Sequence, residues 1–200
     1  VRPRMQMKAY GSKVELSRDG ETRDFVCDDP LGMLARLMSE YTPVHHGPLP
    51  RFTGGAVGYA GYDVIRHYER LPDVPADDRG LPDMVFGMYD TMVIFDHVQK
   101  TVMVVSNAIL EKGTDPDAAY DTACRRVDEI AERLRRPSPH RAEDISRGEG
   151  VDLPFESNFS EAAFCEAVEA SKEYIRAGDI FQVVLSQRLR VGSGADPMDI

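Results

Sequence analysis

In the stretch Gly178-Asp179-Ile180-Phe181-Gln182-Val183-Val184-Leu185-Ser186-Gln187-Arg188, Gln182 is the one polar residue of the run Ile180–Leu185 and stands among apolar neighbours. The glycine at its start is typical of the left-handed residue that ends a helix. The alternation that follows predicts a strand over residues 182–190, which would carry Gln182 on a rigid element. Such an arrangement indicates a functional site, but alternation by itself leaves Gln182 free to face either the site or solvent.

The preceding segment carries the signals of a helix that ends at this glycine. Ser160 is a favourable N-cap residue, and Phe159 and Phe164 stand at the two positions of a hydrophobic staple. We therefore expect a helix from about residue 160 to Gly178, with one continuous apolar face. That face comprises Phe164, Ala167, Val168, Ser171, Tyr174 and Ile175.

The first part of the chain predicts strands and one helix. Gly11-Ser12 and Asp19-Gly20 are turn signals between alternating segments, so residues 5–27 should form a meander of three strands. Asp29-Pro30 then predicts the start of a helix, because proline is tolerated in the first turn. The buried face of this helix should comprise Leu31, Leu34, Leu37 and Tyr41.

A further hairpin and a long helix are predicted downstream. Residues 84–95 have the pattern of one long strand, which turns and returns over residues 101–106. The apolar face of this hairpin should comprise Val93, Phe95, Val102 and Val104. Asp115-Pro116 should begin a helix that runs to about Arg136. Its buried stripe should comprise Ala123, Val127, Ile130 and Leu134.

Residues 52–63 are rich in glycine but match no phosphate-binding fingerprint. No glycine stands two residues after Gly54, as the dinucleotide pattern requires, and no Gly-Lys-Ser/Thr sequence is present. Small residues let a strand lie close to another backbone, so we expect these glycines to be structural. Tyr59 and Tyr62 should point outward, and Asp63 should cap a short helix that runs to about Glu69.

Composition argues against several classes of function. The net charge of -10, from 34 acidic and 24 basic residues, argues against nucleic acid as a partner. No apolar run approaches the roughly 20 residues of a membrane span, so we expect no membrane association. Cys27, Cys124 and Cys165 are far apart in the sequence, which indicates reduced thiols in a cytoplasmic protein.

The residue patterns predict an α+β protein without a complete catalytic constellation. No serine or cysteine nucleophile can be assigned beside a histidine and an acid, and no residues form a cofactor-binding or metal-ligand pattern. The adjacent His45 and His46 lie in a proline-rich loop, where we expect them to be solvated. Residues 137–158 are polar and predict a linker or mobile loop between two parts, residues 1–136 and residues 159–200.

Two stretches of the sequence resemble one enzyme family. The first is Phe52-Thr53-Gly54-Gly55-Ala56-Val57-Gly58-Tyr59, with Gly61-Tyr62-Asp63 and Glu69-Arg70-Leu71-Pro72, and the second runs from Ala177 to Arg188. They resemble the N-terminal region and the opening of the chorismate-binding domain of anthranilate synthase component I, a chorismate-utilising enzyme. The resemblance extends from about Met5 to Ile200. It implies an α+β fold with antiparallel sheets packed face to face and helices outside, incomplete in this chain.

The resemblance also implies an activity. Such enzymes carry out Mg²⁺-dependent amination of chorismate, with ammonia from a glutamine amidotransferase subunit. They then release pyruvate to give anthranilate, for tryptophan biosynthesis. The metal-binding glutamates of the family lie beyond Ile200, so we expect a fragment that is inactive alone and contains no metal ligands of its own.

Gln182 favours the aminating branch of these enzymes. Relatives that add water to chorismate resemble this strand but have lysine at the position, and a lysine with a lowered pKa can take a proton from water. A glutamine amide cannot act as a base but can orient a neutral nucleophile, so Gln182 is the candidate catalytic residue. Aminodeoxychorismate synthase component I shares the glutamine and is the alternative, although Val183-Val184-Leu185-Ser186 is more similar to anthranilate synthase. A non-catalytic binding module on this fold is a hypothesis from another class.

Overall fold

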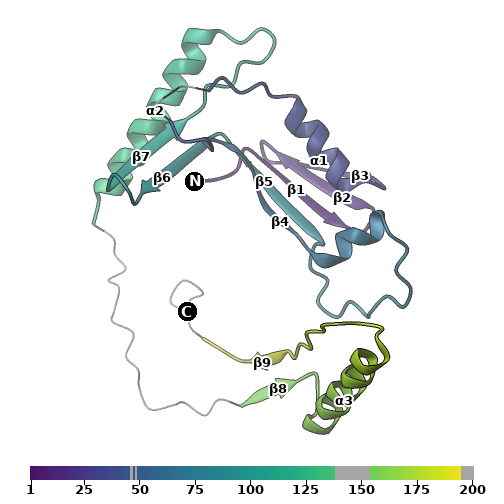
Figure 1. Cartoon of the computed structure of the whole chain (residues 1–200). Coiled ribbons are helices and arrows are strands. Elements are labelled where there is room, and N and C mark those ends of the chain that lie inside the picture. Colours follow the sequence, from purple (N-terminus) through teal and green to yellow (C-terminus); the bar gives the residue numbers. More distant parts are fainter. Residues whose placement is uncertain (46, 48, 138–153, 195–200) are drawn as a thin grey trace. The chain divides into compact units, whose positions relative to one another are not determined.

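The computed structural model describes residues 1–45, 47, 49–137 and 154–194. The chain consists of two compact units, Val1–Pro139 and His140–Ile200. Each unit is an assembly of antiparallel strands with helices (Figure 1). The predicted α+β class with antiparallel sheets is therefore confirmed. The finer division into residues 1–136, 137–158 and 159–200 stays a prediction.

The first unit is built on a five-stranded antiparallel sheet with the order β3-β2-β1-β5-β4. Its strands are β1 (Met5–Tyr10), β2 (Lys13–Arg18), β3 (Glu21–Val26), β4 (Gly55–Ala60) and β5 (Met84–Tyr89). The first three strands form the predicted meander, in which Asp19 and Gly20 adopt φ values of 53° and 86° in the β2–β3 turn. Positive φ at both turn residues suits the twist of a two-residue hairpin.

One face of this sheet forms the core of the unit. Met7, Ala9, Val14 and Met84 are almost fully buried on it, together with Val64 from the 3-10 helix η1 (Tyr62–His67). Helix α1 (Pro30–Ser39) contributes partly buried side chains to the same cluster. These are Leu31, Met33, Leu34 and Leu37. Leu31, Leu34 and Leu37 of the predicted face therefore pack on the sheet, whereas Tyr41 follows the end of α1 and is not part of this cluster.

The long strand expected over residues 84–95 is wrong, because the chain breaks into two strands at Asp90. β5 belongs to the five-stranded sheet, whereas β6 (Thr91–Asp96) pairs with β7 (Thr101–Ser106) and with no other strand in the described part of the chain. The Asp90 carbonyl accepts the Asn107 backbone N–H at 2.7 Å and its side-chain Nδ2 at 3.1 Å. Its carboxylate accepts Arg126 at 2.9 Å. These bonds hold the bend between β5 and β6. The apolar pattern of the sequence continues through this bend and does not reveal it.

Helix α2 (Pro116–Arg135) matches the predicted helix and contacts β7 within the same unit (Figure 1). The Asp115 carboxylate caps its first turn by accepting the Asp117 N–H. The predicted buried stripe is only partly correct. Ala123 is buried, but Leu134 is 49% exposed. Phe95 and Val102 of the β6–β7 hairpin are also exposed.

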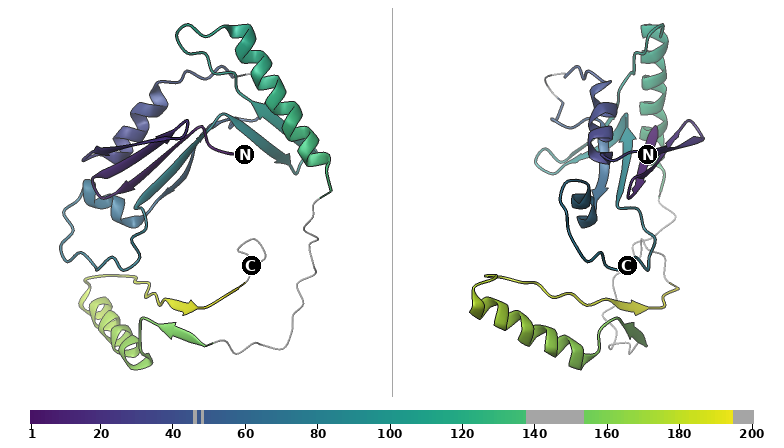
Figure 2. Two further views of the ribbon diagram at one scale, coloured as in Figure 1. Left: turned by 180° about the vertical axis from the view of Figure 1, so that it is seen from behind. Right: turned by 90° about the vertical axis from the view of Figure 1, so that its right-hand side faces the viewer.

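The second unit contains helix α3 (Glu161–Ala177) and two short strands, β8 (Phe155–Ser157) and β9 (Leu189–Val191), which pair with each other (Figure 2). Residues 155–157, near the end of the predicted linker, form β8, while residues 138–153 of that linker lie outside the described residues, so the linker stays a prediction. One expectation is corrected here. The strand expected over residues 182–190 is confined to β9, because no neighbouring strand within the described residues pairs with 182–188.

Candidate functional site

Gln182 lies on an extended segment that follows helix α3. Gly178 ends the helix with φ 82°, and its N–H donates to the Ile175 carbonyl at 3.1 Å. The next N–H, that of Asp179, donates to the Tyr174 carbonyl at 3.0 Å. This pair of bonds is a Schellman-type ending, as the sequence predicted for the glycine. The segment therefore leaves the helix at a fixed point and turns back along it.

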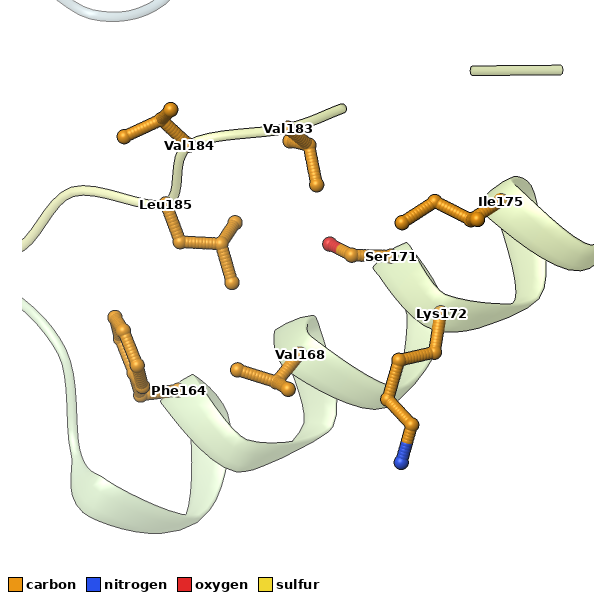
Figure 3. A pocket seen from close by; sticks show the side chains of 8 residues that line it. All are labelled: Phe164, Val168, Ser171, Lys172, Ile175, Val183, Val184 and Leu185. Carbon is orange, nitrogen blue, oxygen red and sulfur yellow. The ribbon is translucent and has the colours of Figure 1, made fainter. Parts of the chain in front are cut away.

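Alternate side chains of the segment pack against α3. Figure 3 shows Val183 and Leu185 directed at the helix, and Val184 directed away from it. Together with the helix they line an open groove of about 420 Å³. The helical side of the groove comprises Phe164, Val168, Ser171, Lys172 and Ile175. These residues include much of the predicted apolar face of α3.

Gln182 lies before β9, outside any strand, and it is exposed; Val184 is 80% exposed. Whether Gln182 belongs to a site therefore stays a prediction. An exposed primary amide offers both a donor and an acceptor to a ligand.

The far end of the segment is held by hydrogen bonds to the residues that precede α3. The Arg188 N–H donates to the Asn158 side-chain oxygen at 2.7 Å, and the Asn158 N–H donates to the Arg188 carbonyl at 3.2 Å. Beside them, the Gln187 amide donates to the Ser157 hydroxyl at 2.8 Å. Sequence reasoning missed these contacts, because partners 30 residues apart on irregular backbone leave no periodic signal.

Charges near the groove are paired along α3. Lys172 donates to the Glu169 carboxylate at 2.8 Å, and this hydrogen bond lowers the pKa of Glu169 below its ordinary value. Arg176 pairs with Glu173 one turn further on. Lys172 and Arg176 are therefore both paired with glutamates of α3. The groove offers a ligand mainly apolar contact.

The start of helix α3 has the N-cap and the ring contact that the sequence predicts. The Ser160 hydroxyl accepts the Ala163 N–H at 3.2 Å, which confirms it as the N-cap. The rings of Phe159 and Phe164 meet edge to face, with centroids 5.9 Å apart. Helix α3 is therefore fixed at both ends by contacts that the sequence predicts.

The glycine-rich stretch of the first unit is structural, as predicted. A Cβ at Gly58 would overlap the Val85 carbonyl of the neighbouring strand, so only glycine allows β4 to pair this closely with β5. Tyr59 is 48% and Tyr62 80% exposed, as expected. Asp63 does not cap a helix, because its carboxylate instead accepts Arg66 at 2.6 Å. Its position inside the 3-10 turn, after Gly61, places it too late to be the cap.

A second polar cluster lies where η1 meets the start of α1. The Tyr68 hydroxyl donates to the Asp29 carboxylate at 2.5 Å, and the same carboxylate accepts the Gly32 N–H at 2.8 Å. The Tyr68 bond and then the Gly32 bond lower the pKa of Asp29. The bond to Asp29 raises the pKa of Tyr68. In the sequence, the proline after Asp29 predicts that Asp29 caps a helix. No pattern in the sequence predicts that Tyr68 binds Asp29.

The remaining candidate ligands do not gather. Among the residues that the structure describes, no group of three or more histidine, cysteine, aspartate or glutamate side chains could hold a metal ion. Cys27, Cys124 and Cys165 are free thiols. His45 is exposed, and His46 lies outside the described residues. No helix within the described parts of the chain is long and apolar enough to cross a bilayer.

Known proteins share both units of this architecture. The chorismate binding enzyme family matches residues 4–200, so the chain belongs to that family. It is 36% identical over 203 residues to anthranilate synthase component 1 of Acetivibrio thermocellus, covering 99% of this chain and 40% of that protein. It is 41% identical over 162 residues to the protein of the same name from Thermus thermophilus, covering 80% of this chain and 32% of that protein.

A solved structure agrees with these relatives. Anthranilate synthase component I from Streptococcus pneumoniae superimposes with a TM-score of 0.74 at 30% sequence identity, covering 100% of this chain and 42% of that chain. The expected resemblance is thus confirmed. The chain spans about 40% of the length of the relatives that match nearly all of it.

Proposed function

We propose that this chain is part of the large subunit of an anthranilate synthase, which converts chorismate and ammonia to anthranilate and pyruvate. One observation carries the proposal. The match to anthranilate synthase component 1 of Acetivibrio thermocellus covers 99% of this chain, and therefore includes both the sheet unit and the Gln182 segment. The proposed reaction serves tryptophan biosynthesis, and a lyase of this kind would act in the cytoplasm.

Gln182 is proposed to orient ammonia for attack on chorismate. Gln182 is exposed, so a substrate can reach its amide. An amide remains neutral at every physiological pH, so it can hydrogen bond to ammonia without protonating it. This supports amination over hydration, in which a basic side chain would be needed to activate water.

The remaining components are proposed from the family resemblance. Mg²⁺ is the expected cofactor, and a glutamine amidotransferase subunit is the expected source of ammonia. No described residue is assigned as a metal ligand, because the described carboxylates do not cluster. The Gln182 segment is proposed to contribute to the site, and by the same resemblance the metal ligands are proposed to come from other parts of the protein.

The test is to assay the purified protein that contains residues 1–200 with chorismate, an ammonium salt and Mg²⁺. Anthranilate is fluorescent, so its formation can be followed directly, and pyruvate can be measured in a coupled assay. Formation of both products in equal amounts supports the proposal. An aminated product without pyruvate would instead assign the protein to the aminodeoxychorismate synthases. No binding of chorismate at all would favour a non-catalytic module.

The proposed role of Gln182 makes a separate prediction. Gln182→Ala should lower the ammonia-dependent rate about ten- to a hundredfold, because a positioned nucleophile is lost, while the melting temperature stays the same. Gln99→Ala is the matched control, since it removes an exposed glutamine amide from the first unit. A Gln182→Ala protein with the rate of the unsubstituted enzyme would contradict the role.

A further inference from the structure

The two outer strands of the five-stranded sheet differ in the residues that they present at their free edges. In the described part of the chain, no strand pairs with the outer side of β3 or of β4 (Figure 1). β3 carries the charged residues Glu21, Arg23 and Asp24, and charges on an edge strand disfavour pairing with another chain. β4 has no charged residue and no proline. The edge of β4 is therefore the one that can accept a further strand.

The backbone groups on the outer side of β4 belong to every second residue. The N–H of Gly61, which follows β4, donates to the Asp83 carbonyl opposite it at 2.7 Å. Hydrogen-bonded pairs alternate along an antiparallel ladder, so the odd-numbered residues of β4 bond to β5. The N–H and C=O groups of Ala56, Gly58 and Ala60 then point to the outer side. Gly58 and Ala60 are exposed, so a second strand can reach them.

The sequence of this edge is nearly symmetrical about Gly58. Residues 55–61 read Gly-Ala-Val-Gly-Tyr-Ala-Gly, which is the same in both directions except that valine exchanges with tyrosine. In an antiparallel pair of two such strands centred on Gly58, Ala56 stands opposite Ala60 of the second copy. Val57 stands opposite Tyr59 of the second copy. The outward backbone groups of both strands meet one another in this register, so each of them finds a partner.

The side chains on both faces of β4 suit such a pair. Ala60 stands opposite the fully buried Met84, so Ala56 and Ala60 lie on the core face, where they are too small to obstruct a neighbouring strand. Val57 and Tyr59 lie on the other face and are 47% and 48% exposed. A β-branched residue directly opposite an aromatic residue stabilises an antiparallel pair, and the twofold symmetry produces this contact twice.

We propose that β4 is a self-association edge, at which the sheet of one copy pairs with the sheet of a second copy about a twofold axis at Gly58. The two five-stranded sheets then form one continuous antiparallel sheet, whatever reaction the protein catalyses. β3 does not fit this role, because a twofold pair centred on Arg23 or on Asp24 places like charges directly opposite each other. One strand pair is a small interface, so the dimer should be weak and should depend on protein concentration.

The first experiment needs no substitution. The mass of the purified protein that contains residues 1–200 is followed by analytical ultracentrifugation over a wide range of concentrations, and amide exchange is measured by NMR. The proposal predicts a dimer at high concentration, with slower exchange of the N–H groups of Ala56, Gly58 and Ala60 as the dimer forms. Exchange of the Asp24 N–H is the internal control. The same alternation places this group on the outer side of β3, so its exchange should not change.

Two results of this experiment would overturn the proposal. One is a protein that stays monomeric at every concentration. The other is a Gly58 N–H that exchanges slowly even in the monomer, because another strand of the same polypeptide would then cover the edge.

The second experiment tests the register with paired charges. One variant carries Val57→Glu with Tyr59→Glu, and the other carries Val57→Lys with Tyr59→Lys. Each variant alone should lose the dimer at concentrations where half of the unsubstituted protein is dimeric, because like charges then stand opposite each other. An equimolar mixture should restore the dimer, since every glutamate then meets a lysine. Val26→Glu is the matched control, because it adds a charge at an exposed valine of β3 and should leave the dimer unchanged.

The substituted side chains lie on the face opposite the core, so both variants should keep the circular dichroism spectrum of the unsubstituted protein. A double-glutamate variant that dimerises as well as the unsubstituted protein overturns the proposal. So does a mixture of the two folded variants that stays monomeric, because the pairing of residue 57 with residue 59 would then be wrong. If either variant does not fold, the exchange measurement on the unsubstituted protein decides.

Discussion

The two stretches that resemble the family most closely have opposite structural surroundings. In the first unit, Gly58 lies in a strand whose backbone pairs along its length with β5, and the neighbouring Met84 is fully buried. In the second unit, Gln182 lies on a segment without a strand partner among the described residues, and the adjacent Phe181 is 94% exposed. Packing within the chain therefore accounts for Gly58 of the first stretch but not for Phe181 and Val184 of the second, which stay exposed.

This difference separates scaffold from site. A glycine required by a close backbone approach is explained by the fold alone. Local packing does not explain why apolar residues beside an amide stay exposed. Exposed apolar residues of this kind often belong to a binding surface. The comparison predicts that substitutions in the first unit change stability, whereas those in the Gln182 segment change function with little cost in stability.

The largest expected effect is on the core of the sheet unit. Met7→Ala should destabilise the protein by about 3 kcal/mol, because Met7 is fully buried and its loss leaves a cavity. Leu185→Ala, in the groove of the second unit, should cost less than about 1 kcal/mol, because Leu185 is only partly buried. Urea denaturation, with hydrogen exchange to assign each unit, measures both. Equal costs for the two substitutions would break the contrast between the units.

A smaller loss is expected where two backbones approach. Gly58→Ala should destabilise the sheet by about 1 to 3 kcal/mol, because its Cβ would meet the Val85 carbonyl and β4 would have to shift. Gly47→Ala is the control, since a Cβ there meets nothing within 4 Å. Thermal denaturation of both variants tests this. A Gly58→Ala protein as stable as the control would show that the glycine is retained for another reason.

Local signals were sufficient to predict most helices and the first meander. The α1 and α2 starts follow from aspartate and proline, and the α3 limits follow from Ser160 and Gly178. Capping and turn chemistry acts between residues close in sequence, so one sequence is enough to read it. The same reasoning predicted the β2–β3 turn from Asp19-Gly20.

Long-range contacts could not be predicted in this way. The break at Asp90 depends on Asn107 and on Arg126 of a later helix, and the apolar pattern continues through it without a sign. The strand expected over residues 182–190 failed for the related reason that a strand needs a partner, which alternation alone does not supply. Gln182 stands out in the sequence as an amide among apolar residues, and its role was proposed by resemblance, but its exposure could not be predicted from alternation.

Helix α3 offers a test of intermediate size. Ser160→Ala should destabilise the helix by about 1 kcal/mol, because the Ala163 N–H loses its acceptor. Ser160→Asp should retain most of this stability, since a carboxylate caps equally well and suits the helix dipole. Hydrogen exchange of the first turn of α3 measures the change locally. Exchange that is the same in Ser160→Ala and in the unsubstituted protein would show that the ring contact of Phe159 and Phe164 is sufficient to hold this end.

The smallest expected effect concerns pH and the pair Tyr68–Asp29. The Tyr68 hydroxyl bond is the largest cause of the lowered pKa of Asp29. A lowered pKa in the folded state means that Asp29 stabilises the fold above its ordinary pKa, and that this contribution is lost as the pH falls through the lowered value. Tyr68→Phe should therefore raise the pKa of Asp29 toward its ordinary value and make the stability of the sheet unit less dependent on acid.

The pKa of Asp29 can be measured directly from the chemical shift of its carboxyl carbon as a function of pH. Tyr62→Phe is the matched control, because Tyr62 is 80% exposed and should leave the titration unchanged. The pKa of Tyr68 itself is raised by the same bond, so its contribution is present below its ordinary pKa and is lost as the pH rises through the raised value. An Asp29 titration that does not move in Tyr68→Phe would leave the Gly32 N–H as the bond that lowers the pKa. The junction of η1 and α1 would then depend on the helix cap alone.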